Sequence, residues 1–143
     1  MSPALSFSLS SAPARRVLTA LHWLLATFPL LLLVSLWGMT ARAAQLLGTF
    51  PRPFVNDPYQ FGADDRPYRA WAWLVAETFN LTALSWLPWL GLVGLTLWCQ
   101  RRYWSKRGGG WSALPWLVPV GLYVLAHLAL IFDPTGRVSW YLD

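Results

Sequence analysis

Residues 17–41 read VLTALHWLLATFPLLLLVSLWGMTA, a run of 25 residues without Asp, Glu, Lys or Arg. Two further runs of this kind follow at residues 78–100 and 108–132. A helix needs about 20 apolar residues to cross about 30 Å of hydrocarbon, and each run is long enough. Apolar residues surround these segments instead of forming one stripe, which is typical of helices in lipid.

The three runs predict an all-α integral membrane protein in a single domain, with transmembrane helices at about residues 17–39, 79–98 and 114–132. The composition agrees, because 12% of the 143 residues are charged, against about 25% in soluble domains. The single cysteine, Cys99, excludes an intramolecular disulfide.

The basic residues predict the orientation, because Lys and Arg resist translocation across a membrane. Residues 1–16 and 99–113 together carry six basic residues and no acid, whereas residues 40–78 sum to zero and residues 133–143 to −1. We therefore expect the N-terminal tail and the basic loop in the cytoplasm, and the first loop and C-terminal tail on the outer side. Two short basic clusters favour contact with anionic lipid headgroups and do not predict a nucleic-acid groove. The six residues are Arg15, Arg16, Arg101, Arg102, Lys106 and Arg107.

A cleaved signal peptide is the alternative to a first transmembrane helix. Arg15 and Arg16 precede the apolar run, and Ala41-Arg42-Ala43 has the small residues of a cleavage site. The apolar run is longer than the roughly 7 to 15 residues of a signal peptide, so we expect a retained helix.

The second helix is predicted to begin before its apolar run. Asp64–Asp65 offers an N-cap and Pro67 suits a first helical turn. A helix from there to about Tyr103 has about 37 residues and is about 55 Å long, so its first part should lie outside the bilayer or along the outer interface. Pro88 predicts a kink near mid-span.

The aromatic residues predict contacts within the outer loop and with other proteins. Residues 43–65 combine Pro and Gly with interleaved aromatics, which favours a compact loop folded over the helix ends or against a neighbour. Most of the 11 tryptophans, Trp140 among them, fall near the predicted boundaries as an aromatic belt. Deeper indole N–H groups need a partner in a place without water. The predicted partner-binding residues are Phe54, Tyr59, Phe61, Trp86 and Trp89.

His22 and His127 lie inside the predicted spans and are the candidate cofactor ligands. Either imidazole alone could be the axial ligand of a haem or a chlorophyll. The first and third helices run in the same direction, which separates the two rings by about 15 Å or more and predicts separate sites. The alternative is a neutral imidazole hydrogen-bonded to a neighbouring carbonyl.

Three functions from different classes remain open. We favour an accessory or structural subunit of a larger membrane complex, with bioenergetic complexes as one host class and no catalysis of its own. One alternative is a tetrapyrrole-binding subunit of an electron-transfer or light-harvesting complex, and another is a small membrane enzyme or transporter with an unidentified site. Gly91 and Gly94 are three residues apart and no Gly-x-x-x-Gly motif is present, which favours a heteromeric partner over a dedicated homodimer.

The orientation can be tested by cysteine labelling from either side of the membrane. We expect Gly109→Cys to react only from the cytoplasm and Gly136→Cys only from outside, because six basic residues hold one side in the cytoplasm. The unsubstituted chain, with Cys99, is the control. The opposite pattern of reactivity at either position contradicts the predicted orientation.

Overall fold

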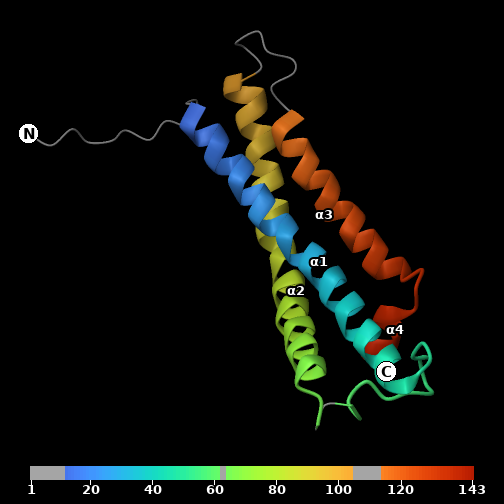
Figure 1. The fold of residues 1–143 in the computed structure, drawn as a ribbon. Coiled ribbons are helices and arrows are strands. Elements are labelled where there is room, and N and C mark those ends of the chain that lie inside the picture. Colours follow the sequence, from blue (N-terminus) through green and yellow to red (C-terminus); the bar gives the residue numbers. More distant parts are fainter. Residues whose placement is uncertain (1–11, 62–63, 105–113) are drawn as a thin grey trace, which may run out of the picture.

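Three long helices dominate the computed structural model, which describes residues 12–61, 64–104 and 114–143. The regular elements in these residues are all helical: α1 (Ala12–Leu47), α2 (Arg66–Cys99), the π-helical η1 (Gln100–Trp104), α3 (Leu114–Phe132) and α4 (Arg137–Leu142). The long helices run alternately down, up and down, so Ala12 and the C-terminus lie at opposite ends of the bundle (Figure 1). Each long helix is long and apolar enough to cross a membrane, as the sequence predicts.

The first helix is longer than its apolar run. It continues to Leu47, so the loop predicted to begin at residue 43 begins instead at Gly48. Ala43 is fully buried in a core cluster at this end of the bundle, and this packing favours continued helix. Gly48 has a φ of 69°, the left-handed conformation that commonly ends a helix and that glycine adopts without strain.

The second helix begins where its capping residues predict. Asp65 is the N-cap, and its carboxylate accepts a hydrogen bond of 2.7 Å from the backbone N–H of Tyr68. The same carboxylate pairs with Arg42 near the end of α1, with a nitrogen-to-oxygen distance of 2.5 Å. The hydrogen bond from Arg42 and then that from Tyr68 lower the pKa of the Asp65 carboxyl. Asp65 therefore joins the end of one long helix to the start of the next.

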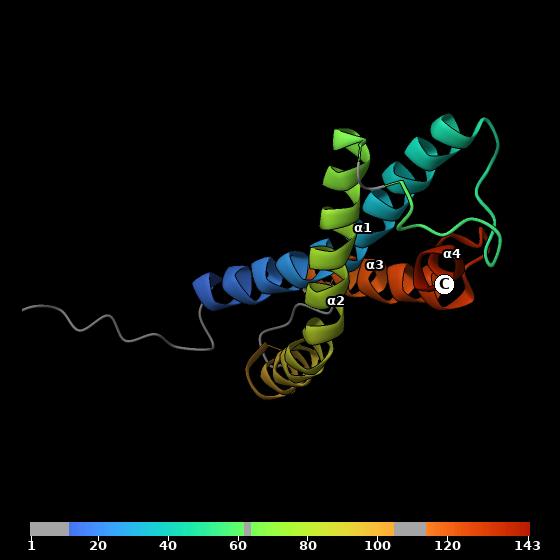
Figure 2. The same cartoon turned by 90° about the horizontal axis from the view of Figure 1, so that it is seen from below.

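Two of the long helices bend in their middle parts. Figure 2 shows both α1 and α2 changing direction along their length. Each contains an internal proline, Pro29 in α1 and Pro88 in α2. Proline removes one backbone hydrogen bond and its ring pushes away the carbonyl of the preceding turn. The bend predicted from Pro88 is therefore present, and α1 has a similar one.

The short helix α4 folds back against the end of α1. Trp140 is almost completely buried there, in a cluster with Leu36 and Met39 of α1. Its indole N–H donates a 2.6 Å hydrogen bond to the carbonyl of Asn56 in the loop. Trp140 is therefore not exposed as a member of an aromatic belt would be, because its ring joins the core and its N–H anchors the loop. Its predicted place near the outer boundary stays a prediction.

The three pairs of long helices differ in how they pack together. α1 packs against both α2 and α3, whereas α2 and α3 meet through large side chains such as Trp89 and Tyr123, whose rings stack at 4.5 Å. Gly38 allows a close approach of α1 and α2, because a Cβ atom at this position would lie 2.5 Å from a ring carbon of Trp71. The Trp71 indole therefore lies directly over the α1 backbone.

Replacing Gly38 with alanine tests this contact. We expect Gly38→Ala to lower the free energy of unfolding in detergent by about 1–3 kcal/mol, because the added methyl group overpacks the interface. The matched control is Gly121→Ala in α3, where a Cβ meets nothing within 4 Å. Equal effects of the two substitutions on unfolding would contradict the proposed close approach.

Candidate functional site

His127 lies in α3 at a place where three aromatic side chains gather. Its side chain is buried, and its Nδ1 is 2.9 Å from the carbonyl oxygen of Tyr123, one turn earlier. A carbonyl oxygen only accepts hydrogen bonds, so the proton resides on Nδ1 and, in the neutral ring, Nε2 carries a lone pair. The Trp86 ring lies edge-on to the imidazole, with 4.7 Å between ring centroids.

Tyr123 is the centre of this aromatic cluster and links α3 to α2. Its hydroxyl is 2.7 Å from the hydroxyl oxygen of Ser85, which itself donates a 2.7 Å hydrogen bond to the carbonyl of Thr82. Because the Ser85 proton is directed to that carbonyl, the Tyr123 hydroxyl donates to Ser85. On its face, the Tyr123 ring stacks on Trp89 with planes 11° apart. These contacts fix Tyr123 and, through its carbonyl, the orientation of His127.

A small apolar pocket lies beside His127, with a volume of about 190 Å³. Two buried polar atoms on its lining residues, Nε2 of His127 and Oγ1 of Thr82, have no hydrogen-bond partner among the described residues. Buried polar groups are paired as a rule, so this pair makes the pocket a candidate site for a ligand with a polar or coordinating atom. Its lining residues are Leu32, Leu36, Phe79, Thr82, Ala83, Trp86, His127, Leu130, Val138 and Tyr141.

His22 has a different environment, in which it connects the three long helices. The ring is fully buried in α1, and its Nε2 lies 3.1 Å from the hydroxyl oxygen of Thr96 in α2. Its face stacks on the Trp116 indole of α3, with 5.7 Å between ring centroids. The Nε2 atom is thus engaged within the chain, whereas Nδ1 has no hydrogen-bond partner among the described residues. Each buried histidine therefore has one bonded ring nitrogen and one without a partner in the described part of the chain, and His127 is the one that lines the apolar pocket.

The two histidines lie at different levels of the bundle. Trp116, which stacks on His22, precedes His127 by 11 residues in α3. At 1.5 Å per residue this separation is about 16 Å along the helix. The structure therefore places the two imidazoles at separate sites.

The predicted partner-binding residues of the loop differ in exposure. Phe54 is 86% exposed and Tyr59 is 68% exposed. Phe61 is partly buried and packs edge-on against Tyr68 of α2, with 5.6 Å between ring centroids. The Tyr68 hydroxyl in turn donates a hydrogen bond to the carbonyl of Pro58. The loop thus folds onto the helix ends as expected. The Phe54 ring is largely exposed, and the Tyr59 ring lies 6.5 Å from that of Tyr141 in α4 while most of its surface stays exposed.

The predicted partner-binding residues of α2 are not part of the loop surface. Trp86 is partly exposed beside His127, whereas Trp89 is buried against Tyr123. The structure therefore divides the predicted residues into an outer group on the loop and an inner group within the aromatic cluster. The Trp89 ring makes its contacts within the chain, by stacking on Tyr123.

Sequence reasoning missed the residues that orient the two histidines. Tyr123 lies four residues before His127, a spacing that places both on one face of a helix, and this spacing was the available signal. Ser85, Thr82 and Thr96 come from α2, and no local pattern indicates that they meet α3 or α1.

Comparison with known proteins identifies no relatives for this arrangement. No family model, no curated protein and no solved structure matches the chain.

Proposed function

We propose that the protein is an accessory or structural subunit of a larger membrane complex and has no catalysis of its own. In this proposal the three long helices cross the membrane, with the N-terminus in the cytoplasm and the C-terminus outside. The excess of basic residues at one end of the bundle supports this orientation. The exposed aromatic surface at the other end supports binding to another subunit.

The main support for this proposal is the exposed surface of the loop beyond the helix ends. Phe54, Val55 and Tyr59 are large apolar or aromatic residues, and all are strongly exposed. They lie outside the apolar runs, so the hydrocarbon of a bilayer does not cover them. Contiguous exposed apolar residues outside the membrane are typical of protein interfaces.

The same surface indicates the chemistry of the partner. A recess of about 370 Å³ is lined by Phe54, Val55, Asp57 and Asp143. Asp143 also accepts a hydrogen bond from the backbone N–H of Phe54, which holds the end of α4 against the loop. Two carboxylates beside exposed apolar side chains fit a partner that presents a basic residue within an apolar patch.

Site-specific photocrosslinking tests the subunit proposal. We expect p-benzoylphenylalanine at Phe54 or Tyr59 to give one discrete heteromeric adduct in native membranes, because these side chains face the partner. The matched control is Leu125 in α3, which is 63% exposed but lies within an apolar helix. There we expect lipid adducts in place of a protein adduct.

The partner must meet two further conditions. The crosslinked protein should co-purify in mild detergent without crosslinking, and Asp57→Arg should reduce both the adduct and the co-purification. An adduct of two copies of this chain contradicts the heteromeric proposal. So does a monomer in mild detergent that forms no protein adduct at Phe54 or Tyr59.

A second candidate function is tetrapyrrole binding through His127 at the contact with a partner. The observation that favours it is the fixed imidazole, with Nδ1 bonded to the Tyr123 carbonyl and Nε2 without a partner among the described residues. A hydrogen bond from the other ring nitrogen to a carbonyl oxygen orients metal-ligating histidines in this way. The pocket of about 190 Å³ is smaller than the roughly 300–1,000 Å³ of enclosed ligand sites. The chain would therefore supply the axial ligand, and a partner would cover the ring.

The absorption spectrum of the complex in mild detergent tests this second function. We expect a porphyrin or chlorin band that His127→Gly abolishes and that added imidazole restores, because the free imidazole replaces the lost axial ligand. His22→Gln is the matched control and should keep the band, since His22 lies beside Trp116, about 16 Å along the bundle from His127. A complex without such a band, or a band that survives His127→Gly unchanged, excludes His127 as a ligand.

A further inference from the structure

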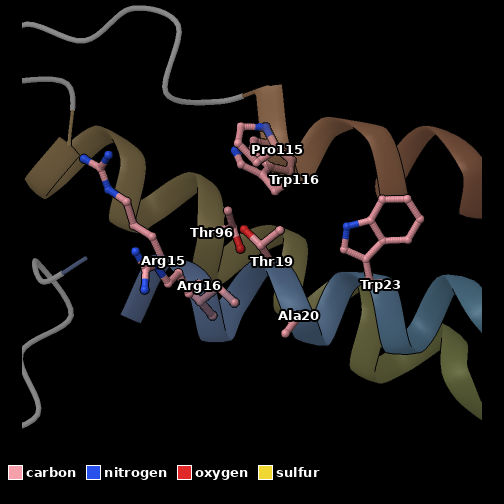
Figure 3. A pocket seen from close by; sticks show the side chains of 9 residues that line it. Arg15, Arg16, Thr19, Ala20, Trp23, Thr96, Pro115 and Trp116 are labelled. Carbon is pink, nitrogen blue, oxygen red and sulfur yellow. The ribbon is translucent and has the colours of Figure 1, made fainter. Parts of the chain in front are cut away.

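Another pocket, larger than the one beside His127, lies at the opposite end of the bundle from the loop, where the basic residues gather. Its volume is about 460 Å³, within the range of about 300–1,000 Å³ typical of ligand sites. Figure 3 shows that its walls come from the start of α1, the end of α2 and the start of α3. We call it the arginine pocket. Its lining residues are Arg15, Arg16, Leu18, Thr19, Ala20, Trp23, Thr96, Pro115 and Trp116.

The arginine pocket is charged at one end and apolar at the other. Arg15 and Arg16 lie at one side of it, and Trp23 lies two helical turns further into the bundle (Figure 3). Between them the walls are mainly apolar, apart from the threonine side chains. A molecule with an anionic head and an apolar tail matches this distribution of charge.

A buried hydrogen-bond donor gives a second and independent indication of a ligand. Trp116 lines the pocket and is 6% exposed. Its indole N–H has no hydrogen-bond partner among the described residues. An indole N–H only donates, so the missing partner is an acceptor, such as a phosphate or ester oxygen. Unpaired buried donors are rare in folded proteins, which favours a bound acceptor at this place.

The backbone adds to the positive potential of the arginine pocket. α1 begins at Ala12 and α3 begins at Leu114, so the N-terminal ends of two long helices lie at this end of the bundle (Figure 1). Helix N-termini carry a partial positive charge and favour anions. Arg101 and Arg102 follow α2 at the same end.

We propose that the arginine pocket binds one anionic glycerophospholipid, with its phosphate between Arg15 and Arg16 and one acyl chain along Trp23. The indole N–H of Trp116 donates to an oxygen of the headgroup or of the ester linkage. The lipid then fills the space between α1, α2 and α3 at this end of the bundle. This site requires insertion in a membrane but no partner subunit, so its test is separate from the crosslinking test.

Native mass spectrometry of the protein from nanodiscs tests the lipid site. The nanodiscs contain phosphatidylglycerol and phosphatidylcholine in equal amounts. We expect the wild type to retain one phosphatidylglycerol, and Arg15→Gln with Arg16→Gln to lower the retained fraction about tenfold. The matched control is Arg101→Gln with Arg102→Gln, which removes the same charge at the same end from residues that do not line the pocket. We expect this control to lower retention by less than about threefold.

Trp116→Phe provides a second variant that keeps an aromatic ring and removes the N–H donor. We expect about fivefold lower retention of phosphatidylglycerol, because a hydrogen bond to a charged group is lost. Helix content and elution as a single species are checked for every variant.

Three outcomes overturn the lipid site. Equal losses in the two arginine pairs show general electrostatic attraction to the bilayer. Equal retention of phosphatidylcholine shows that the anionic head is not recognised. Displacement of the lipid by millimolar inorganic phosphate shows a site for free phosphate that makes no use of the acyl chain.

Discussion

Gly38 and Trp71 bring α1 and α2 into direct contact, and α1 is the helix against which both other long helices pack. In lipid, helices gain little hydrophobic free energy by meeting, so tight packing and hydrogen bonds must hold them together. α1 uses one side for α2 and another for α3. The space that remains between α2 and α3 is bridged by the large rings of Trp89 and Tyr123.

The two buried histidines make different contacts in the bundle. His22 joins α1 to Thr96 and stacks on Trp116, so its polar and aromatic contacts hold the bundle together near the basic end. His127 bonds inside its own helix and presents its other nitrogen, without a partner among the described residues, close to a pocket. The same residue type thus supports packing at one level and a candidate ligand site at the other.

Hydropathy predicted the three helices because the length of an apolar run is a local property of the sequence. The predicted span at residues 114–132 coincides with α3, and the capping role of Asp65 also follows from local chemistry. The burial of Trp140 depends on α4 folding back onto α1, a contact across about a hundred residues that no local pattern encodes. The bonds of Ser85 to Tyr123 and Thr96 to His22 also depend on tertiary packing.

The anchoring of the loop by α4 has a consequence for the order of assembly during synthesis. Arg42 and Asp65 can pair as soon as the start of α2 has left the ribosome, which joins the end of α1 to the start of α2 early in synthesis. Trp140, whose N–H holds Asn56, is made only after all three long helices. The contacts of the loop with α4 therefore form last, after its contacts with Tyr68 at the start of α2. The loop surface is complete only after α4 has docked. Binding of the proposed partner to this surface would therefore follow completion of the fold.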